Sequence, residues 1–128
     1  MTTIKRVEGQ DEIYNEAGLQ LIGSHGPNQT GLSPRELLEA ALGLCVSISL
    51  QKIMDYDGVE YDKNTIHVEV TATKPEDKTN RFSNFSVRLT LPAGLEPAYK
   101  EKLHTVVERA CTIGNTLKQS AIIKMVEV

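Results

Sequence analysis

The strongest pattern in the sequence is a run from Leu37 to Met54 in which almost every position is apolar or small. Just before it, Ser33 can cap a helix, Pro34 suits the first helical position, and Glu36 completes an S-x-x-E capping box. A helix that is apolar on all sides is a buried one, because a surface helix shows a polar stripe. We therefore expect a central buried helix whose apolar run is too short to cross a membrane.

Alternation of apolar and polar residues predicts strands on both sides of this helix, which should run from about Pro34 to about Tyr56. A second, amphipathic helix should begin at Pro97, and its apolar stripe ends on Cys111. One short turn is expected over residues 116–120. The expected strands are residues 2–8, 12–15, 19–22, 65–73, 81–91 and 121–128. This order, without repeats or linkers, predicts a single α+β domain over residues 1–128 with antiparallel sheets.

Composition narrows the function mainly by exclusion. The formal charge of −3 and the pI near 5.6 give no electrostatic reason to bind nucleic acid or an anionic membrane. The N-terminus lacks the apolar segment of a secretory signal, so the expected location is the cytoplasm. The sequence has two cysteines but no C-x-x-C motif and no paired histidines, and we expect no structural metal.

The two cysteines are the candidate chemistry. A buried cysteine usually behaves as a small hydrophobe, and inert packing of Cys45 is the default interpretation. However, Cys45 lies within the first helix and Cys111 at the end of the second, and these are the helices with the strongest apolar faces. If both pack on one sheet, their thiols can meet as a nucleophilic and a resolving cysteine. His104 precedes Cys111 by seven residues on the same helical face, and is either a base for that thiol or a boundary histidine.

Three parts of the sequence, in the same order and spacing, resemble the OsmC/Ohr family. The resemblance covers most of the chain from Gly31 onward. It rests on Ser33-Pro34-x-Glu36-Leu37-Leu38-x-Ala40-Ala41-Leu42-Gly43-x-Cys45, on the strand near Arg81–Leu91, and on Cys111-x-Ile113-x-Asn115-Thr116-Leu117.

The resemblance implies an intertwined α+β homodimer with two sites at the subunit interface. It implies a thiol-dependent peroxidase that reduces organic hydroperoxides, with a dithiol reductant of the lipoyl type and no cofactor. By position, Cys45 matches the peroxidatic thiol and Cys111 the resolving thiol.

The charged partner of the thiolate departs from the family pattern. Where active relatives carry a glutamate directly after the helix proline, this chain has Arg35, and Glu36 follows. At about 100° per residue, Glu36 points nearly opposite Cys45, which favours its capping role over a catalytic one. The arginine of the family's N-terminal strand region has only Lys5 and Arg6 as counterparts. Arg35 is therefore the local candidate for the cation beside the thiolate.

Two functions from different classes follow. In the first, Cys45 attacks an organic hydroperoxide and Cys111 resolves the sulfenic acid in oxidative-stress defence. In the alternative, the protein is not an enzyme and binds an apolar ligand at the dimer interface or senses redox state through its thiols. Inert packing of both cysteines remains the third reading.

Overall fold

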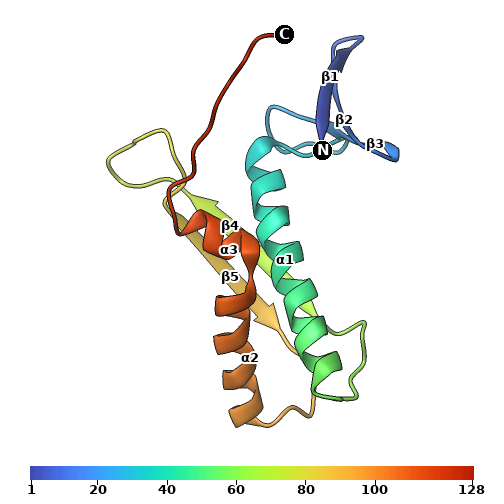
Figure 1. The fold of residues 1–128 in the computed structure, drawn as a ribbon, viewed down its shortest axis with the longest axis vertical. Helices are drawn as coiled ribbons and strands as arrows, with labels where there is room; N and C mark the ends of the chain where they lie inside the picture. Colours follow the sequence, from blue (N-terminus) through green and yellow to red (C-terminus); the bar gives the residue numbers. More distant parts are fainter. The chain divides into compact units, whose positions relative to one another are not determined.

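The computed structural model describes residues 1–128 and divides them into two compact units, residues 1–40 and 41–128. Figure 1 shows the chain from its N-terminal strands through a long helix to a hairpin and two further helices. The observed class is α+β with antiparallel sheets, as predicted.

The first unit is built on a three-stranded antiparallel sheet in the order β1-β2-β3. Its strands are β1 (Thr3–Val7), β2 (Gln10–Asn15) and β3 (Gly18–Gly23), which confirms the three predicted N-terminal strands. The loop after β3 returns to the sheet through a bridge between Gly23 and Leu32. Gly31 allows this return, because a Cβ there would lie 2.1 Å from the carbonyl oxygen of Ile22.

Helix α1 (Pro34–Tyr56) has the predicted bounds, and both of its ends form as the sequence indicates. The Ser33 amide donates to Glu36 Oε1 at 2.9 Å, and the Glu36 amide donates to Ser33 Oγ at 3.3 Å. This reciprocal pair is the capping box. At the other end, Gly58 adopts a φ of 69°, which is easy for glycine, and its amide donates to the Asp55 carbonyl at 3.1 Å.

The second unit packs helices against a hairpin. Strands β4 (His67–Thr73) and β5 (Asn84–Thr90) pair antiparallel, and α2 (Pro97–Ala110) follows, all within the predicted segments. Gly43 of α1 faces β4 closely, since a Cβ there would lie 3.2 Å from Val70 Cγ2. The buried core of this unit consists of Leu42, Val46, Leu50, Met54, Leu103, Val107 and Cys111.

A polar tie joins the end of α1 to the start of α2. The Asp57 carboxylate accepts hydrogen bonds from Tyr99 Oη at 2.8 Å and from Lys102 Nζ at 2.9 Å. These bonds lower the pKa of Asp57, and the bond from Lys102 contributes most. Burial and the hydrogen bond to Asp57 raise the pKa of Tyr99 to about 12. The tyrosine therefore remains a hydrogen-bond donor throughout the physiological pH range.

Two local predictions at the C-terminus are wrong. Residues 112–117 form a helix, α3 (Thr112–Leu117), instead of a break followed by a turn at 116–120. Residues 121–128 form no strand and pair with neither sheet. All eight are exposed, and five of them are large apolar residues that are each more than four-fifths accessible: Ile122, Ile123, Met125, Val126 and Val128.

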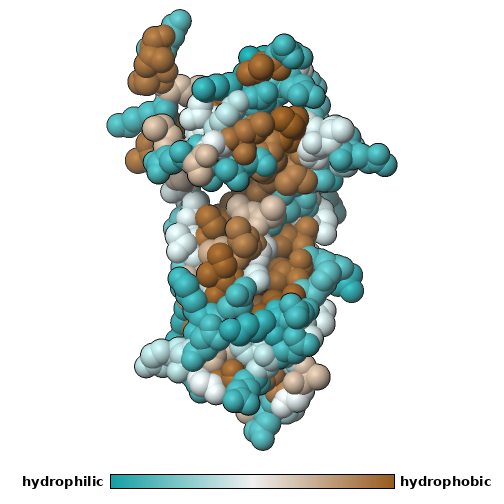
Figure 2. Space-filling model, turned by 90° about the vertical axis from the view of Figure 1, so that its right-hand side faces the viewer, coloured by the Kyte–Doolittle hydropathy of each residue, from teal (hydrophilic) through white to brown (hydrophobic).

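The central helix is also less buried than its sequence predicts. Only one stripe of α1 is buried, formed by residues four positions apart. Leu44 and Ile48 are 63% and 41% exposed. Exposed apolar side chains are visible on the face of the molecule shown in Figure 2. By length and composition alone α1 is apolar enough to cross a membrane, contrary to our expectation, although core helices of soluble proteins meet the same criterion. In this fold α1 supplies core residues.

Candidate active site

Cys45 lies half-buried on α1 and lines a cavity of about 480 Å³, which we call the Cys45 cavity. From α1, the side chains of Ser49 and Lys52 line it too, because positions 45, 49 and 52 share a helical face. Lys52 is the only charged residue among those that line it. The full lining is Ala41, Leu44, Cys45, Ile48, Ser49, Lys52, Ile53, Ala110, Thr112 and Ile113.

Cys111 lies at the junction of α2 and α3 and serves both helices. Its amide donates to the Val107 carbonyl at 2.9 Å and ends α2, while its Sγ accepts the Gly114 amide at 3.3 Å and begins α3. Asn115 strengthens the junction by donating its side-chain amide to the Arg109 carbonyl at 3.0 Å. The thiol is only 3% exposed. This sulfur cap is the reason why α3 starts where the sequence pattern suggested a break.

Each thiol affects the pKa of the other, and the two effects have opposite signs. The pKa of Cys45 is lowered, above all by a hydrogen bond from the backbone amide of Ile113. Hydrogen bonds from the Cys111 thiol, the Thr112 amide and Ser49 lower it further. Burial in the first place, and then the neighbouring Cys45, raise the pKa of Cys111. Cys45 is thus the thiol that ionises more easily, and Cys111 is the one that keeps its proton.

Arg35 and Glu36, the other two candidates from the sequence, both interact with residues of the first unit. Arg35 directs its Nε toward Glu39 Oε1 at 3.8 Å, in an i,i+4 ion pair on the first turns of α1. Glu36 is held by the capping box, and its hydrogen bonds with Ser33 lower its pKa. Capping is therefore the observed function of Glu36. For Arg35, partnership with the thiolate stays a prediction.

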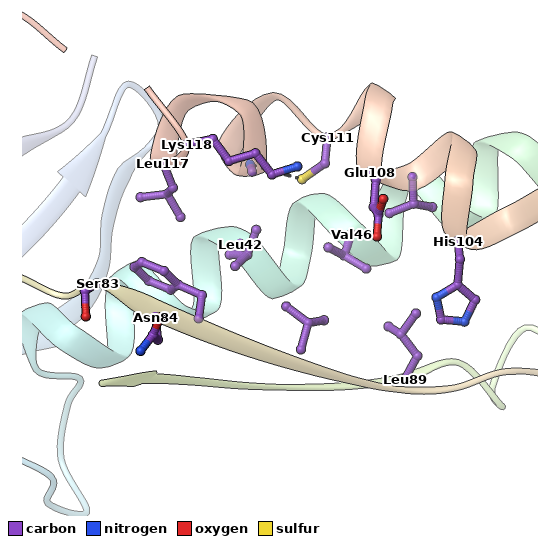
Figure 3. A pocket seen from close by; sticks show the side chains of 14 residues that line it. Leu42, Val46, Ser83, Asn84, Leu89, His104, Glu108, Cys111, Leu117 and Lys118 are labelled. Atoms are coloured by element: carbon purple, nitrogen blue, oxygen red, sulfur yellow. Dashed lines mark hydrogen bonds between the residues drawn. The ribbon is translucent and has the colours of Figure 1, made fainter. Parts of the chain in front are cut away.

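A second cavity, of about 630 Å³, lies between β5 and the helices, and we call it the Cys111 cavity. Figure 3 shows the Cys111 sulfur directed toward its interior from the helical side, with Leu89 on the strand side. His104 also lines it, at one end of the view, whereas Ser83 and Asn84 lie at the other end. Ser83 Oγ is fully buried and has no hydrogen-bond partner.

Several features of the site were not predicted from the sequence. Among them are Ser49, Lys52 and the backbone amides of Thr112 and Ile113, to which the sequence pattern assigns no role. Helical spacing places Ser49 and Lys52 beside Cys45, and that signal was available in the sequence. The contribution of the amides depends on the packing of α3 against α1 and had no sequence signal. The chain contains no cluster of histidine, cysteine and carboxylate side chains that could hold a metal ion.

Chemically, the arrangement suits a thiol redox couple. It offers one accessible cysteine with a stabilised thiolate and one buried, protonated cysteine beside it. Such a pair can pass from dithiol to disulfide without a cofactor, provided that an oxidant reaches the first sulfur and a reductant restores both.

Comparison with known proteins agrees on one family. The profile of the OsmC-like protein family matches residues 26–126. Comparison with curated proteins gave no significant match. An OsmC-like protein from Mycoplasma pneumoniae has a similar structure, with a TM-score of 0.75 at 17% identity over 92% of this chain and 86% of that one.

Two structures described as organic hydroperoxide resistance proteins share the fold. OhrB of Bacillus subtilis has a TM-score of 0.61 at 21% identity, over 90% of this chain and 88% of OhrB. The OsmC protein of Legionella pneumophila has a TM-score of 0.60 at 14% identity, over 92% and 89% of the two chains. At these identities the structures establish the fold, while the profile covers most of the sequence and both cysteines. The chain belongs to the OsmC-like protein family.

Proposed function

We propose that this protein is a thiol-dependent peroxidase that reduces organic hydroperoxides. The observation that carries the proposal is the asymmetric pair of interacting thiols, in which the pKa of Cys45 is lowered and that of Cys111 is raised. Membership of the OsmC-like family supports it, as does the similarity to two proteins described as organic hydroperoxide resistance proteins.

The reaction begins at the Cys45 thiolate. Its sulfur attacks the distal oxygen of the hydroperoxide, the O–O bond breaks, and the electron pair leaves on the proximal oxygen, which takes a proton and departs as the alcohol. Cys45 is then a sulfenic acid. The Cys111 sulfur attacks the Cys45 sulfur, the Cys111 proton and the sulfenic hydroxyl leave as water, and a disulfide remains. A dithiol reductant supplies two electrons and two protons to restore both thiols.

Backbone amides rather than a cation stabilise the thiolate in this proposal. The Ile113 and Thr112 amides and the Ser49 hydroxyl donate to the Cys45 sulfur, and each favours its charged form. Lys52 adds a positive charge at the wall of the same cavity. Arg35, whose Nε lies 3.8 Å from Glu39 Oε1, has no assigned part in this proposal.

The walls of the Cys45 cavity favour organic substrates. Leu44, Ile48, Ile53 and Ile113 surround the thiol with apolar surface. An alkyl or aryl hydroperoxide buries its carbon skeleton against these side chains, whereas hydrogen peroxide has none to bury. We expect bulky hydroperoxides to react faster than hydrogen peroxide.

We further propose that the protein acts as a homodimer, with both compact units in one domain and with its chemistry in the reducing cytoplasm. Residues 121–128 pair with no strand, and their large apolar side chains are more than four-fifths exposed. A second copy of the chain would cover such surfaces. Light scattering should give twice the 14.1 kDa of one chain, and a variant lacking residues 121–128 should lose mass toward one chain. A monomeric full-length protein would contradict this.

The experiment that tests the peroxidase is intact mass spectrometry before and after one equivalent of cumene hydroperoxide. The reduced wild type should lose two hydrogens as the disulfide forms. Cys111→Ser should gain one oxygen on Cys45, and Cys45→Ser should not react within minutes. If the wild type does not react, the peroxidase proposal fails, and binding of an apolar ligand becomes the function to pursue.

A further inference from the structure

The Cys45 cavity contains a reactive sulfur and a single charged side chain. Lys52 is the only charged residue that lines it, and it follows Cys45 on α1 by seven residues. Seven residues turn a helix by about 700°, which is about 20° short of two full turns, so the two side chains share one helical face. The same seven residues rise by about 10 Å. Cys45 and Lys52 therefore lie two turns apart along one wall of the cavity.

The direction of helical side chains brings the Lys52 ammonium closer to the thiol than the helical rise alone suggests. In an α-helix each Cα–Cβ bond tilts toward the N-terminus, so a long side chain lies over the turn that precedes it. For Lys52 that turn carries Ile48 and Ser49, which also line the cavity. A molecule that spans less than about 10 Å can therefore contact both the Cys45 sulfur and the Lys52 ammonium.

The charge of Lys52 has no partner within the chain. The residues four positions before and after it are an isoleucine and a tyrosine. The nearest carboxylate in sequence, that of Asp55, hydrogen-bonds with Tyr61 instead. The ion pairs of the structure all join other residues. Lys52 is also not among the groups that lower the pKa of Cys45. Its ammonium is thus available to an anion that enters the cavity.

Apart from Lys52, the cavity is mostly apolar. Leu44, Ile48 and Ile113 contribute hydrocarbon surface, and the volume of about 480 Å³ lies within the range of small-molecule sites. No arginine lines the cavity, although arginine is the usual residue for phosphate recognition. One ammonium matches the single negative charge of a carboxylate. The cavity therefore suits a molecule with a carbon skeleton and one carboxylate.

We propose that Lys52 is a specificity-determining residue that selects hydroperoxides carrying a carboxylate. The substrate places its hydroperoxide at Cys45, its carbon skeleton against the apolar wall and its carboxylate at the Lys52 ammonium. Neutral hydroperoxides react at the same sulfur but lack the second anchor. This inference rests on the proposed function, because it names the class of hydroperoxide that the site prefers.

The expected preference is moderate. Lys52 is exposed, so its ion pair with a substrate stays partly hydrated. Exposed pairs of this kind correspond to about a three- to fivefold change in a binding or rate constant. Because the side chain is exposed, substitutions at this position leave the core of the protein intact.

A matched pair of substrates isolates the effect of the carboxylate. Cumene hydroperoxide and its para-carboxylate have the same reacting group and ring, and differ by one charge. Quenched-flow mass spectrometry of the wild type at neutral pH, with each rate divided by that of free cysteine, should show the acid to react about three- to fivefold faster. Lys52→Gln should bring this ratio to about one. Effects on the Cys45 thiolate cancel in the ratio, so an equal ratio in both proteins would overturn the proposal.

Charge reversal with a matched control separates Lys52 from the net charge of the protein. Lys52→Glu should invert the preference, so that the neutral substrate reacts faster. Lys118→Glu makes the same change of charge at the Cys111 cavity and should keep the ratio within about twofold of the wild type. Raising the salt concentration from about 0.05 M to about 0.5 M should reduce the ratio of the wild type, because salt screens exposed charges. An equal shift in Lys118→Glu would contradict a specific role for Lys52.

A binding measurement distinguishes failure of this inference from failure of the peroxidase. The probes are 4-isopropylbenzoate and the neutral 4-isopropylbenzamide, which keep the ring and lack the peroxide. The acid should protect Cys45 of the reduced wild type from iodoacetamide at lower concentration than the amide does, and Lys52→Gln should abolish the difference. Equal protection by both probes would overturn the role of Lys52, even if peroxides react. Selective protection without any oxidation by peroxide would support the carboxylate site and contradict the peroxidase alone.

Discussion

Cys45 and Cys111 carry the same chemical group in two different settings. Cys45 sits in the middle of a helix whose own amides are occupied, and it receives hydrogen bonds from the amides of Thr112 and Ile113 on a neighbouring element. Cys111 sits at a helix junction, is 3% exposed, and accepts from Gly114. The difference is that donated hydrogen bonds lower the pKa of Cys45, whereas burial raises the pKa of Cys111.

The largest effect should come from removing the buried member of the pair. In Cys111→Ser, the first equivalent of cumene hydroperoxide should still be consumed, because Cys45 keeps its Ile113 and Ser49 donors. Steady-state turnover with a dithiol should fall by about a hundredfold or more, since no disulfide can form. Peroxide consumption in a coupled assay measures both. Undiminished turnover would mean that Cys111 is dispensable and that its environment has no bearing on the reaction at Cys45.

A second test follows the ionisation of the two thiols with pH. The rate of Cys45 oxidation should rise with pH and reach a plateau, with a midpoint below the ordinary cysteine value of about 8.5. Below the midpoint the rate should fall about tenfold per pH unit, as the thiolate is protonated. Stopped-flow measurements on Cys111→Ser isolate this step. A midpoint above 8.5 would mean that the amides do not stabilise the thiolate.

The hydroxyl beside Cys45 allows a finer test. Ser49→Ala removes one donor to the sulfur, so the pKa of Cys45 should rise and the oxidation rate at neutral pH should fall by about two- to fivefold. Ser47→Ala is the matched control, because Ser47 Oγ accepts from Gln51 Nε2 at 3.1 Å instead. Equal effects of both substitutions would point to helix stability and not to the thiolate.

The smallest effect on the thiols should come from the polar tie between α1 and α2. Hydrogen bonds lower the pKa of Asp57 in the folded protein. The Asp57 carboxylate therefore stabilises the fold at pH values above its unfolded-state pKa, and this contribution is lost as pH falls through its folded-state pKa. Asp57→Asn should therefore lower the melting temperature slightly at neutral pH and flatten its decline in acid. Oxidation of Cys45 should stay within about twofold of the wild type. A larger change would show that helix ends control the thiol pair.

The parts of the fold that were predictable are those governed by local pattern. Ser33 and Glu36 form the capping box that their spacing indicates, and Gly58 ends α1 where the sequence places it. The hairpin strands follow the alternation of residues 65–73 and 81–91. These features depend on neighbours a few positions away, which is the range that sequence patterns report.

The parts that were missed depend on contacts between distant segments. The start of α3 is fixed by a sulfur that accepts the Gly114 amide, and cysteine is not a usual capping residue. Residues 121–128 are rich in β-branched residues as strands are, yet they pair with no strand in this structure. The cysteine pair itself was predictable from the two apolar helices, whereas the amides of Ile113 and Thr112 that lower the pKa of Cys45 were not.

The sulfur cap on α3 has a consequence for how the protein can be observed. Because Cys111 Sγ accepts the Gly114 amide in the dithiol state, bonding of that sulfur to Cys45 must alter the hydrogen bond that begins α3. The Gly114 amide is thus a native spectroscopic probe of oxidation state, one that needs no attached dye. Its proton and nitrogen resonances should shift on oxidation, and its hydrogen exchange should quicken, allowing each turnover to be followed in real time.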